Sequence, residues 1–287
     1  MNNNYTIFTD SACDLSAEVL RLWGVKFCSL SFTFDGESHS YENHALPAPV
    51  FYQFMRDGKT AKTSAINPDT FNKAFERELK KGRDILYLGF SSALSTTCNS
   101  ARIAAEELLE QYPERKILVV DTLGASAGQG LLVYLTVQQK RNGATIEEAA
   151  QFAEDNKMSI CQWFTTDTLT YLQRGGRVST MSAVFGNMLD IRPVMHVDDE
   201  GKLTNTAKAR GRKATLRALA DKAIKSAKDG SPIFISHADC EADAIALGNM
   251  IRQARGLKTE VITDVGPVIG AHAGPGTLAL FFVGTER

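Results

Sequence analysis

The sequence predicts an α/β protein built from two domains. Short β-branched or aromatic runs that end in polar or glycine-rich turns alternate with longer segments of helical period, which is typical of sheets covered by helices. The 287 residues suit two domains or one large one, and the two halves differ in pattern. We therefore expect an N-terminal Rossmann-like domain with a parallel sheet, followed by a C-terminal α/β two-layer domain with a mixed or antiparallel sheet.

Strands and helices are expected to alternate along most of the chain. The β-rich runs predict strands at residues 5–9, 25–34, 85–89, 117–121, 194–197, 233–236, 260–263 and 278–283. Helical period predicts helices at residues 68–80, 95–111, 126–142, 145–157, 213–228 and 238–255, with a shorter one at 47–54.

The first half has the pattern of a parallel sheet with a ligand-binding edge. Three of its strands run into turns of small or hydroxyl residues, at residues 10–11, 91–92 and 121–122, before a helix begins. In a parallel sheet these turns meet at the carboxyl edge, where ligands of open α/β sheets bind.

The second half differs. Residues 198–201 have the composition of a hairpin turn and the last strands lie close together in sequence, which favours a mixed or antiparallel sheet. We place the boundary near residues 156–159, so that the domains are residues 1–157 and 158–287.

Charge and composition exclude several classes of protein. The chain has 32 Lys and Arg residues against 33 Asp and Glu residues, a net charge of -1, which argues against a nucleic-acid binder. Five cysteines include no C-x-x-C pair, so we expect neither a disulfide framework nor a metal site. No G-x-x-x-x-G-K-[ST] loop occurs, and no G-x-G-x-x-G follows a strand, so no nucleotide cofactor is expected.

No segment is expected to enter a membrane or to direct export. The N-terminus lacks a basic stretch followed by an apolar one, so we expect a cytoplasmic protein. The longest uncharged run, residues 265–285, contains two prolines and a histidine, and is interpreted as a loop plus a buried strand.

Two hydroxyl-rich segments precede predicted helices. Thr63 and Ser64 lie just before the helix expected from residue 68, where helix capping is the simplest interpretation. Residues 91–97 hold more hydroxyls than a cap requires. Ser95 or a near neighbour is expected to cap the next helix, and the other hydroxyls could line an anion site at its positive end.

The same segment comes within one residue of a nucleophile elbow. Residues 89–93 match G-x-S-x-G except that Ala93 replaces the second glycine, and Asp121 and His272 follow in suitable order. A serine hydrolase of acyl esters, using Ser91 and His272, is therefore the alternative function.

His272 and several cationic residues are the remaining candidates. His272 lies among small residues at 270–277, where a ligand could approach the imidazole; a histidine that only fills a turn is the alternative. Arg174 and Arg177 surround a glycine pair, which by itself indicates a solvated turn. The basic cluster of Lys208, Arg210, Arg212 and Lys213 indicates either a solvated face or a contact with phosphate or an acidic partner.

Several segments, taken in order, carry a family resemblance. They are Thr9-Asp10-Ser11 with Asp14-Leu15, Thr63-Ser64 before Pro68, Ser91-Ser92-Ala93-Leu94-Ser95 with Asn99-Ser100-Ala101, Asp121-Thr122, Tyr171-Leu172 with Gly175-Gly176-Arg177, Lys208-Ala209-Arg210-Gly211 with Lys213-Ala214, and His272-Ala273-Gly274-Pro275-Gly276. Together they resemble the DegV family of bacterial fatty-acid-binding proteins, the lipid-carrying subunits of fatty acid kinase. The resemblance implies a two-domain α/β protein that holds a long-chain fatty acid between its domains.

The resemblance also implies roles for individual residues. Those expected at the fatty-acid carboxylate are Thr63, Ser95, Ser92, Arg177 and His272. Arg210 and His272 are associated with transfer of phosphate to that carboxylate by a separate ATP-dependent kinase. A carrier of this kind presents acyl-phosphate, has no catalytic cycle of its own and needs no cofactor.

The sequence departs from the family pattern near the expected headgroup. Thr96 stands where a glycine is usual and Cys98 where an aromatic residue is usual, so we expect this turn to differ in shape. Residues 38–49 lack the acidic residues that often follow the early tyrosine. Chain-length preference and kinase pairing are the properties that such changes would alter.

Overall fold

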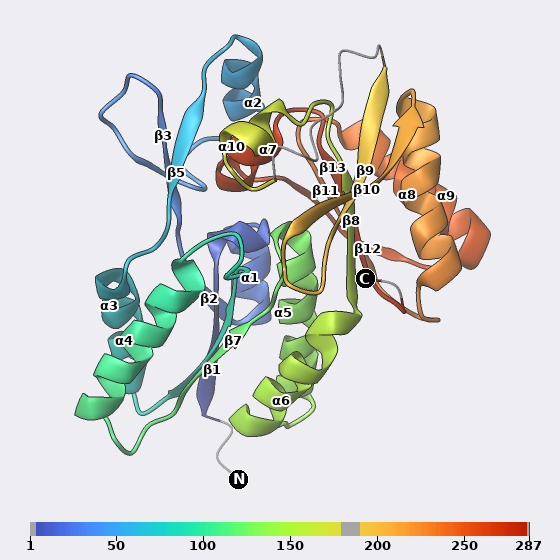
Figure 1. Cartoon of the computed structure of the whole chain (residues 1–287). Coiled ribbons are helices and arrows are strands. Elements are labelled where there is room, and N and C mark those ends of the chain that lie inside the picture. The colour runs from blue at the N-terminus through green and yellow to red at the C-terminus, as the bar shows by residue number, and fades with distance from the viewer. Residues whose placement is uncertain (1–3, 179–189, 286) are drawn as a thin grey trace.

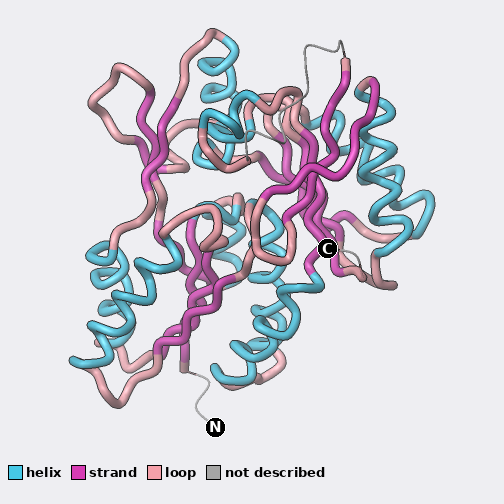
Figure 2. The backbone as a smooth tube through the Cα atoms, viewed as in Figure 1, coloured by secondary structure: helices cyan, strands magenta, loops and turns pink. Residues whose placement is uncertain are grey.

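Two β-sheets covered by helices stand side by side, with a small third sheet next to them (Figure 1). The computed structural model describes residues 4–178, 190–285 and 287. The sheets have the strand orders β2-β1-β6-β7, β10-β9-β8-β13-β11-β12 and β4-β3-β5. The arrangement of helices and strands, coloured in Figure 2, confirms the predicted α/β class with a parallel sheet before a mixed one.

The four-stranded sheet is wholly parallel, as predicted. Its strands are β2 (Val25–Cys28), β1 (Tyr5–Asp10), β6 (Asp84–Gly89) and β7 (Ile117–Asp121). Every residue of β1 is buried, as is every residue of β6 after its first. Near-continuous apolar runs of this kind are typical of parallel strands with helices on both faces.

Alternate residues of these strands serve opposite faces of the sheet. Helices α3 (Pro68–Leu79) and α4 (Thr97–Gln111) lie on one face, and α5 (Ser126–Arg141) and α6 (Ile146–Asn156) on the other. Phe8 and Tyr87 belong to the core under α3 and α4, whereas Ile7 and Leu86 belong to the core under α5 and α6. A short turn, η1 (Ser11–Cys13), and helix α1 (Ala17–Trp23) connect β1 to β2.

Capping residues explain where these helices begin. Asn67 Oδ1 accepts a hydrogen bond from Thr70 N at 2.9 Å, and Pro68 occupies the first position of α3, as predicted. Thr145 and Glu148 form a capping box before α6. Helix α4 begins at Thr97, so its start was predicted too early.

The six-stranded sheet is mixed, as predicted for the second half. It contains β10 (Leu203–Arg210), β9 (Ile191–Val197), β8 (Ile160–Thr165), β13 (Leu278–Val283), β11 (Ile233–His237) and β12 (Thr259–Asp264). Among the described pairs in this sheet, β11 and β12 are parallel and the others are antiparallel. The turn expected at residues 198–201 joins β9 to β10 in an antiparallel hairpin, which confirms it.

This sheet packs against helices on both faces. Helices α8 (Arg212–Ser226) and α9 (Glu241–Arg255) cover one face, around Ile235 and Phe282. Helix α5 packs on the other face, in a core that includes Phe234 and Phe281. One helix thus contributes to the cores of both large sheets, which holds them together.

The small sheet was not predicted. Its strands are β4 (Tyr41–Glu42), β3 (Ser31–Phe34) and β5 (Ala61–Ser64). The prediction of a single strand at residues 25–34 was wrong, because the chain turns at residues 29–30. The first part, β2, pairs with β1 in the parallel sheet, whereas the second part, β3, pairs with β5. Helix α2 (Ala48–Arg56), the predicted short helix, covers this sheet, with the rings of Phe32 and Phe51 centred 5.1 Å apart.

Helix α10 (Pro267–Ala273) links the end of the chain to its beginning. The first N–H groups of a helix have no partner within the helix. The Asp14 carboxylate accepts from Gly266 N at 3.0 Å, and Asn43 Oδ1 accepts from Val268 N at 2.7 Å. Two N-terminal side chains therefore fix the start of α10, whose body contacts β5.

Several elements were not predicted. They are α1, β5, β8, β10, α7 (Thr170–Arg174), α10 and the single turn η2 (Lys157–Ser159). The run at residues 265–285 contains the expected strand β13, but α10 replaces part of the expected loop. Within the described parts of the chain, no helix combines the length and apolarity needed to cross a membrane. The domain boundary between residues 157 and 158 stays a proposal, supported by the end of α6 at Asn156 and the start of β8 at Ile160.

Candidate binding site

A cavity of roughly 430 Å³ lies between the carboxyl edge of the parallel sheet and the inner face of the six-stranded sheet. Its volume is within the range of about 300–1,000 Å³ typical of small-ligand sites. Much of its wall is apolar and comes from both large sheets, with Phe90 after β6, Phe164 on β8, Leu203 on β10 and Phe281 on β13.

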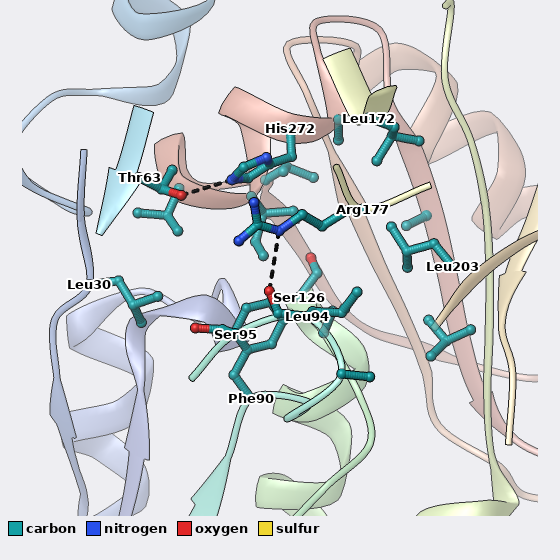
Figure 3. Close-up of a pocket in the computed structure, with 18 of the residues that line it drawn as sticks. Leu30, Thr63, Phe90, Leu94, Ser95, Ser126, Leu172, Arg177, Leu203 and His272 are labelled. Carbon is teal, nitrogen blue, oxygen red and sulfur yellow. Dashed lines mark hydrogen bonds between the residues drawn. The ribbon is translucent and has the colours of Figure 1, made fainter. Parts of the chain in front are cut away.

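The structure brings all five residues expected at a carboxylate to this cavity. They are Thr63, Ser92, Ser95, Arg177 and His272. They come from β5, the loop after β6, the segment after α7, and α10, and the close-up in Figure 3 shows the labelled ones pointing toward a common space. Arg210 is not among the lining residues; it is exposed at the end of β10.

Thr63 and His272 form the first contact of this group. Thr63 Oγ1 and His272 Nε2 are 2.8 Å apart and are joined by a hydrogen bond. The interpretation of Thr63 as a helix cap was wrong, because Thr63 lies on β5 and Asn67 caps α3. Burial and the nearby positive charge of Arg177 lower the pKa of His272 to about 4, so the imidazole is neutral at physiological pH.

A glycine packs directly on the other side of the imidazole. His272 Nδ1 is buried and has no hydrogen-bond partner among the described residues. A Cβ atom at Gly175 would lie 2.1 Å from His272 Nδ1, so only glycine fits there without displacing the ring. The first glycine of the pair before Arg177 therefore positions His272.

Arg177 connects two loops at the polar end of the cavity. Its Nε donates to the carbonyl oxygen of Leu94 at 3.2 Å, and its Nη1 donates to the carbonyl oxygen of Gly175. In the described part of the chain, no carboxylate lies within ion-pair distance of Arg177. The charge of this guanidinium is thus not balanced by those residues, which suits a site for an anion.

The loop after β6 presents Ser92 and Ser95. Ser95 Oγ accepts from Thr97 N at 3.2 Å, but the cap position of α4 belongs to its neighbour Thr96, whose side chain makes no capping hydrogen bond. Ser92 is exposed, and its N–H donates to Asp121 Oδ1 at 3.3 Å. Thr96, which stands where the family resemblance implies a glycine, has φ −73°. This is an ordinary right-handed value, so a threonine causes no backbone strain at this position.

Ser91 is not arranged as a nucleophile. It is fully buried, donates to the carbonyl oxygen of Gly201 at 2.9 Å, and accepts from Ala93 N at 3.3 Å. His272 is bonded to Thr63 instead of Ser91. The structure therefore gives no support to the serine hydrolase alternative.

The basic cluster divides into a structural part and an exposed part. Arg212 pairs with Asp243 at 2.8 Å and donates to the carbonyl oxygen of Gly276 at 2.8 Å, so it holds α8 in place. Arg210 and Lys213 are exposed. A partner protein could therefore contact the exposed residues of this cluster.

Comparison with known proteins gives the family. The profile described as "Uncharacterised protein, DegV family" matches residues 4–285. The chain belongs to the DegV family. A DegV domain-containing protein of Clostridium perfringens is 44% identical over 99% of this chain and 98% of its own length.

Two solved structures share this fold. The crystal structure of a stearic acid-binding protein from Eubacterium ventriosum has a TM-score of 0.88 and 25% identity, and covers 98% of each chain. The Fatty Acid Kinase (Fak) B3 protein of Streptococcus pneumoniae, solved with linoleic acid, has a TM-score of 0.85 and 24% identity over 98% of this chain and 99% of its own.

Sequence reasoning missed the residues that shape the cavity wall. Phe164 and Leu203 lie on strands that were not predicted, and Ser126 was expected only as the start of a helix. The alternation in β13 could have shown that Phe281 and Leu280 face opposite ways, but not which of them faces a cavity.

Substitution of Gly175 tests whether close packing holds His272. In Gly175→Ala the added methyl group must displace the imidazole, so we expect the pKa of His272 to rise from about 4 back toward its usual value. NMR titration of the His272 ring measures this. Gly176→Ala is the matched control, since its Cβ would meet nothing within 4 Å although its φ of +68° strains the backbone. An unchanged His272 titration in Gly175→Ala would contradict the assignment.

Proposed function

We propose that this DegV protein binds a long-chain fatty acid in the cavity and presents its carboxylate to a separate ATP-dependent fatty acid kinase. The observation that carries the proposal is the polarity of the cavity. Its apolar wall ends at hydroxyls, a neutral histidine and a guanidinium that pairs with no carboxylate of the described residues. A ligand that matches this arrangement has a long apolar part and one anionic end.

The polar end can satisfy a carboxylate. A carboxylate beside apolar surface needs several hydrogen-bond donors or a counter-charge. If neutral His272 donates its Nε2 hydrogen to Thr63 Oγ1, the hydroxyl hydrogen of Thr63 is left for the carboxylate. Arg177 adds a positive charge, and Ser95 and Ser92 add hydroxyls on the opposite loop.

The apolar wall can retain the acyl chain. Burying about fifteen methylene groups contributes on the order of 12 kcal/mol, at roughly 0.8 kcal/mol each, before the costs of association and ordering. This gain suits tight retention of a cargo that is poorly soluble in water. The stearic acid-binding relative from Eubacterium ventriosum supports the same class of ligand.

The kinase step depends on groups at and beyond the mouth of the site. Phosphorylation of the bound carboxylate would add negative charge, which Arg210 could stabilise as a cation and His272 indirectly, by orienting the Thr63 hydroxyl. Arg210 is exposed and lies outside the cavity, so it suits a surface that faces the kinase. The fold shared with the Fak B3 protein is consistent with this role. The carrier itself then needs no catalytic cycle, and its cytoplasmic location stays a prediction.

The decisive experiment is organic extraction of the purified protein, followed by mass spectrometry of the extract. We expect close to one free fatty acid per protein chain, since the cavity has one polar end. An empty extract from a protein that also fails to take up added fatty acid would overturn the proposal.

Removal of the Thr63 hydroxyl tests the carboxylate site. Thr63→Val keeps the shape of the side chain but removes a hydrogen bond to a charged group, so we expect fatty-acid affinity to fall about 10- to 100-fold. Competition binding measures the change. Thr33→Val on the neighbouring strand β3 is the control, since Thr33 does not line the cavity. Equal affinities for the two variants would remove Thr63 from the site.

Arg210 tests the kinase step separately from binding. We expect Arg210→Ala to bind fatty acid as the wild type does, but to accept phosphate about a hundredfold more slowly from a fatty acid kinase catalytic subunit and ATP. Radiolabelled phosphate transfer measures the rate. Arg217→Ala removes another exposed arginine, on α8, and serves as the control. Normal phosphate acceptance by Arg210→Ala would show that this residue has no part in the transfer.

A further inference from the structure

Two serine hydroxyls interrupt the apolar wall of the cavity. Ser126 begins α5 and Ser236 lies on β11, and both line the cavity together with apolar residues such as Phe281. Their Oγ atoms are 2.8 Å apart, and Ser126 Oγ lies 2.5 Å from Asp14 Oδ2. The proposed carboxylate site uses none of these three polar groups, so their presence needs another explanation.

The buried carboxylate fixes the direction of this chain of hydrogen bonds. Ionised Asp14 can only accept, so Ser126 donates its hydrogen to Asp14, and Ser236 donates to Ser126. The other Asp14 oxygen accepts from Gly266 N. Ser126 therefore keeps an accepting lone pair and has no hydrogen left to give. Ser126 is 5% exposed and Ser236 0%, so Ser126 is the member that a ligand meets.

The backbone at Ser126 is strained. Its φ is +52°, in the left-handed region that side chains with a Cβ rarely adopt. Glycine would occupy this conformation without steric strain. A non-glycine residue held in such a conformation is typical of a position where the side chain has a role. The hydroxyl that bonds Asp14 and lines the cavity is the group that this conformation presents.

We propose that Ser126 is a specificity-determining residue that accepts a hydrogen bond from a hydroxyl group on the acyl chain. The inference rests on the proposed fatty-acid binding and deepens it. An unsubstituted chain leaves the lone pair of Ser126 facing methylene groups, whereas a chain hydroxyl can donate to it. A keto group has no hydrogen to donate, so the same lone pair cannot bind it. The preferred cargo class is therefore a monohydroxylated long-chain fatty acid.

The test compares stearic acid with a positional series of its monohydroxylated and keto derivatives. Binding is measured at about pH 8.5, where Asp14, whose pKa burial raises to about 7, is ionised. We expect one hydroxylated isomer to bind the wild type about five- to tenfold more tightly than its keto counterpart. Ser126→Gly should lose this preference, and because it relieves the left-handed backbone it should remain folded.

Two further variants separate recognition from a structural effect. Ser236→Ala removes the hydroxyl behind Ser126 but leaves its accepting lone pair, so the preference should persist. In Asp14→Asn the side-chain oxygen still accepts from Gly266 N, which turns the amide nitrogen toward Ser126. The Ser126 hydrogen is then free for a ligand. The keto derivatives should bind this variant about fivefold more tightly than they bind the wild type.

The outcomes distinguish this inference from the proposed function. If stearic acid binds but every hydroxyl-to-keto affinity ratio is the same in the wild type and in Ser126→Gly, the role of Ser126 is overturned and the fatty-acid carrier stands. If neither stearic acid nor any derivative binds the wild type, both proposals are overturned.

Discussion

The first turn of α10 finds its hydrogen-bond partners at the other end of the chain, and the site depends on that contact. A helix of seven residues is too short to be stable alone. Asp14 and Asn43 accept its first N–H groups and thereby fix its position. Its last turn then places His272 against Thr63 on β5. The polar end of the cavity therefore forms only when the N-terminal segments and α10 have folded together.

The electrostatics of the cavity follow from that placement. Burial and the charge of Arg177 keep His272 neutral, so Arg177 is the one positive group among the described residues that line the polar end. Two backbone carbonyl oxygens hold the guanidinium in place. Among the described residues no carboxylate balances this charge, and an unbalanced charge beside an apolar wall is costly until an anion binds. The proposed fatty-acid binding would explain the charge and the wall together, whereas neither feature alone would select that ligand.

The candidate residues differ in whether neighbouring sequence alone could predict their contacts. The cap position of α4 falls at Thr96, one residue from the expected Ser95, because the start of a helix depends mainly on neighbouring residues. Thr63 also precedes a helix, yet it lies on a strand that pairs with β3 and bonds a distant histidine. Ser91 has the spacing of a nucleophile, but its hydroxyl donates a hydrogen bond to the carbonyl oxygen of Gly201 in the β9–β10 hairpin. The family resemblance indicated five of the residues that line the cavity, because it draws on positions along the whole chain.

The sequence by itself determined the elements whose signals are local. The fully buried run of β1, the capping box of α6 and the hairpin turn at residues 198–201 all follow from the chemistry of adjacent residues. Only the tertiary structure decided that the chain turns after β2 into a second sheet, and that Thr63 meets His272 across 209 positions. Such contacts depend on which surfaces bury each other, and sequence periodicity carries no information on that choice.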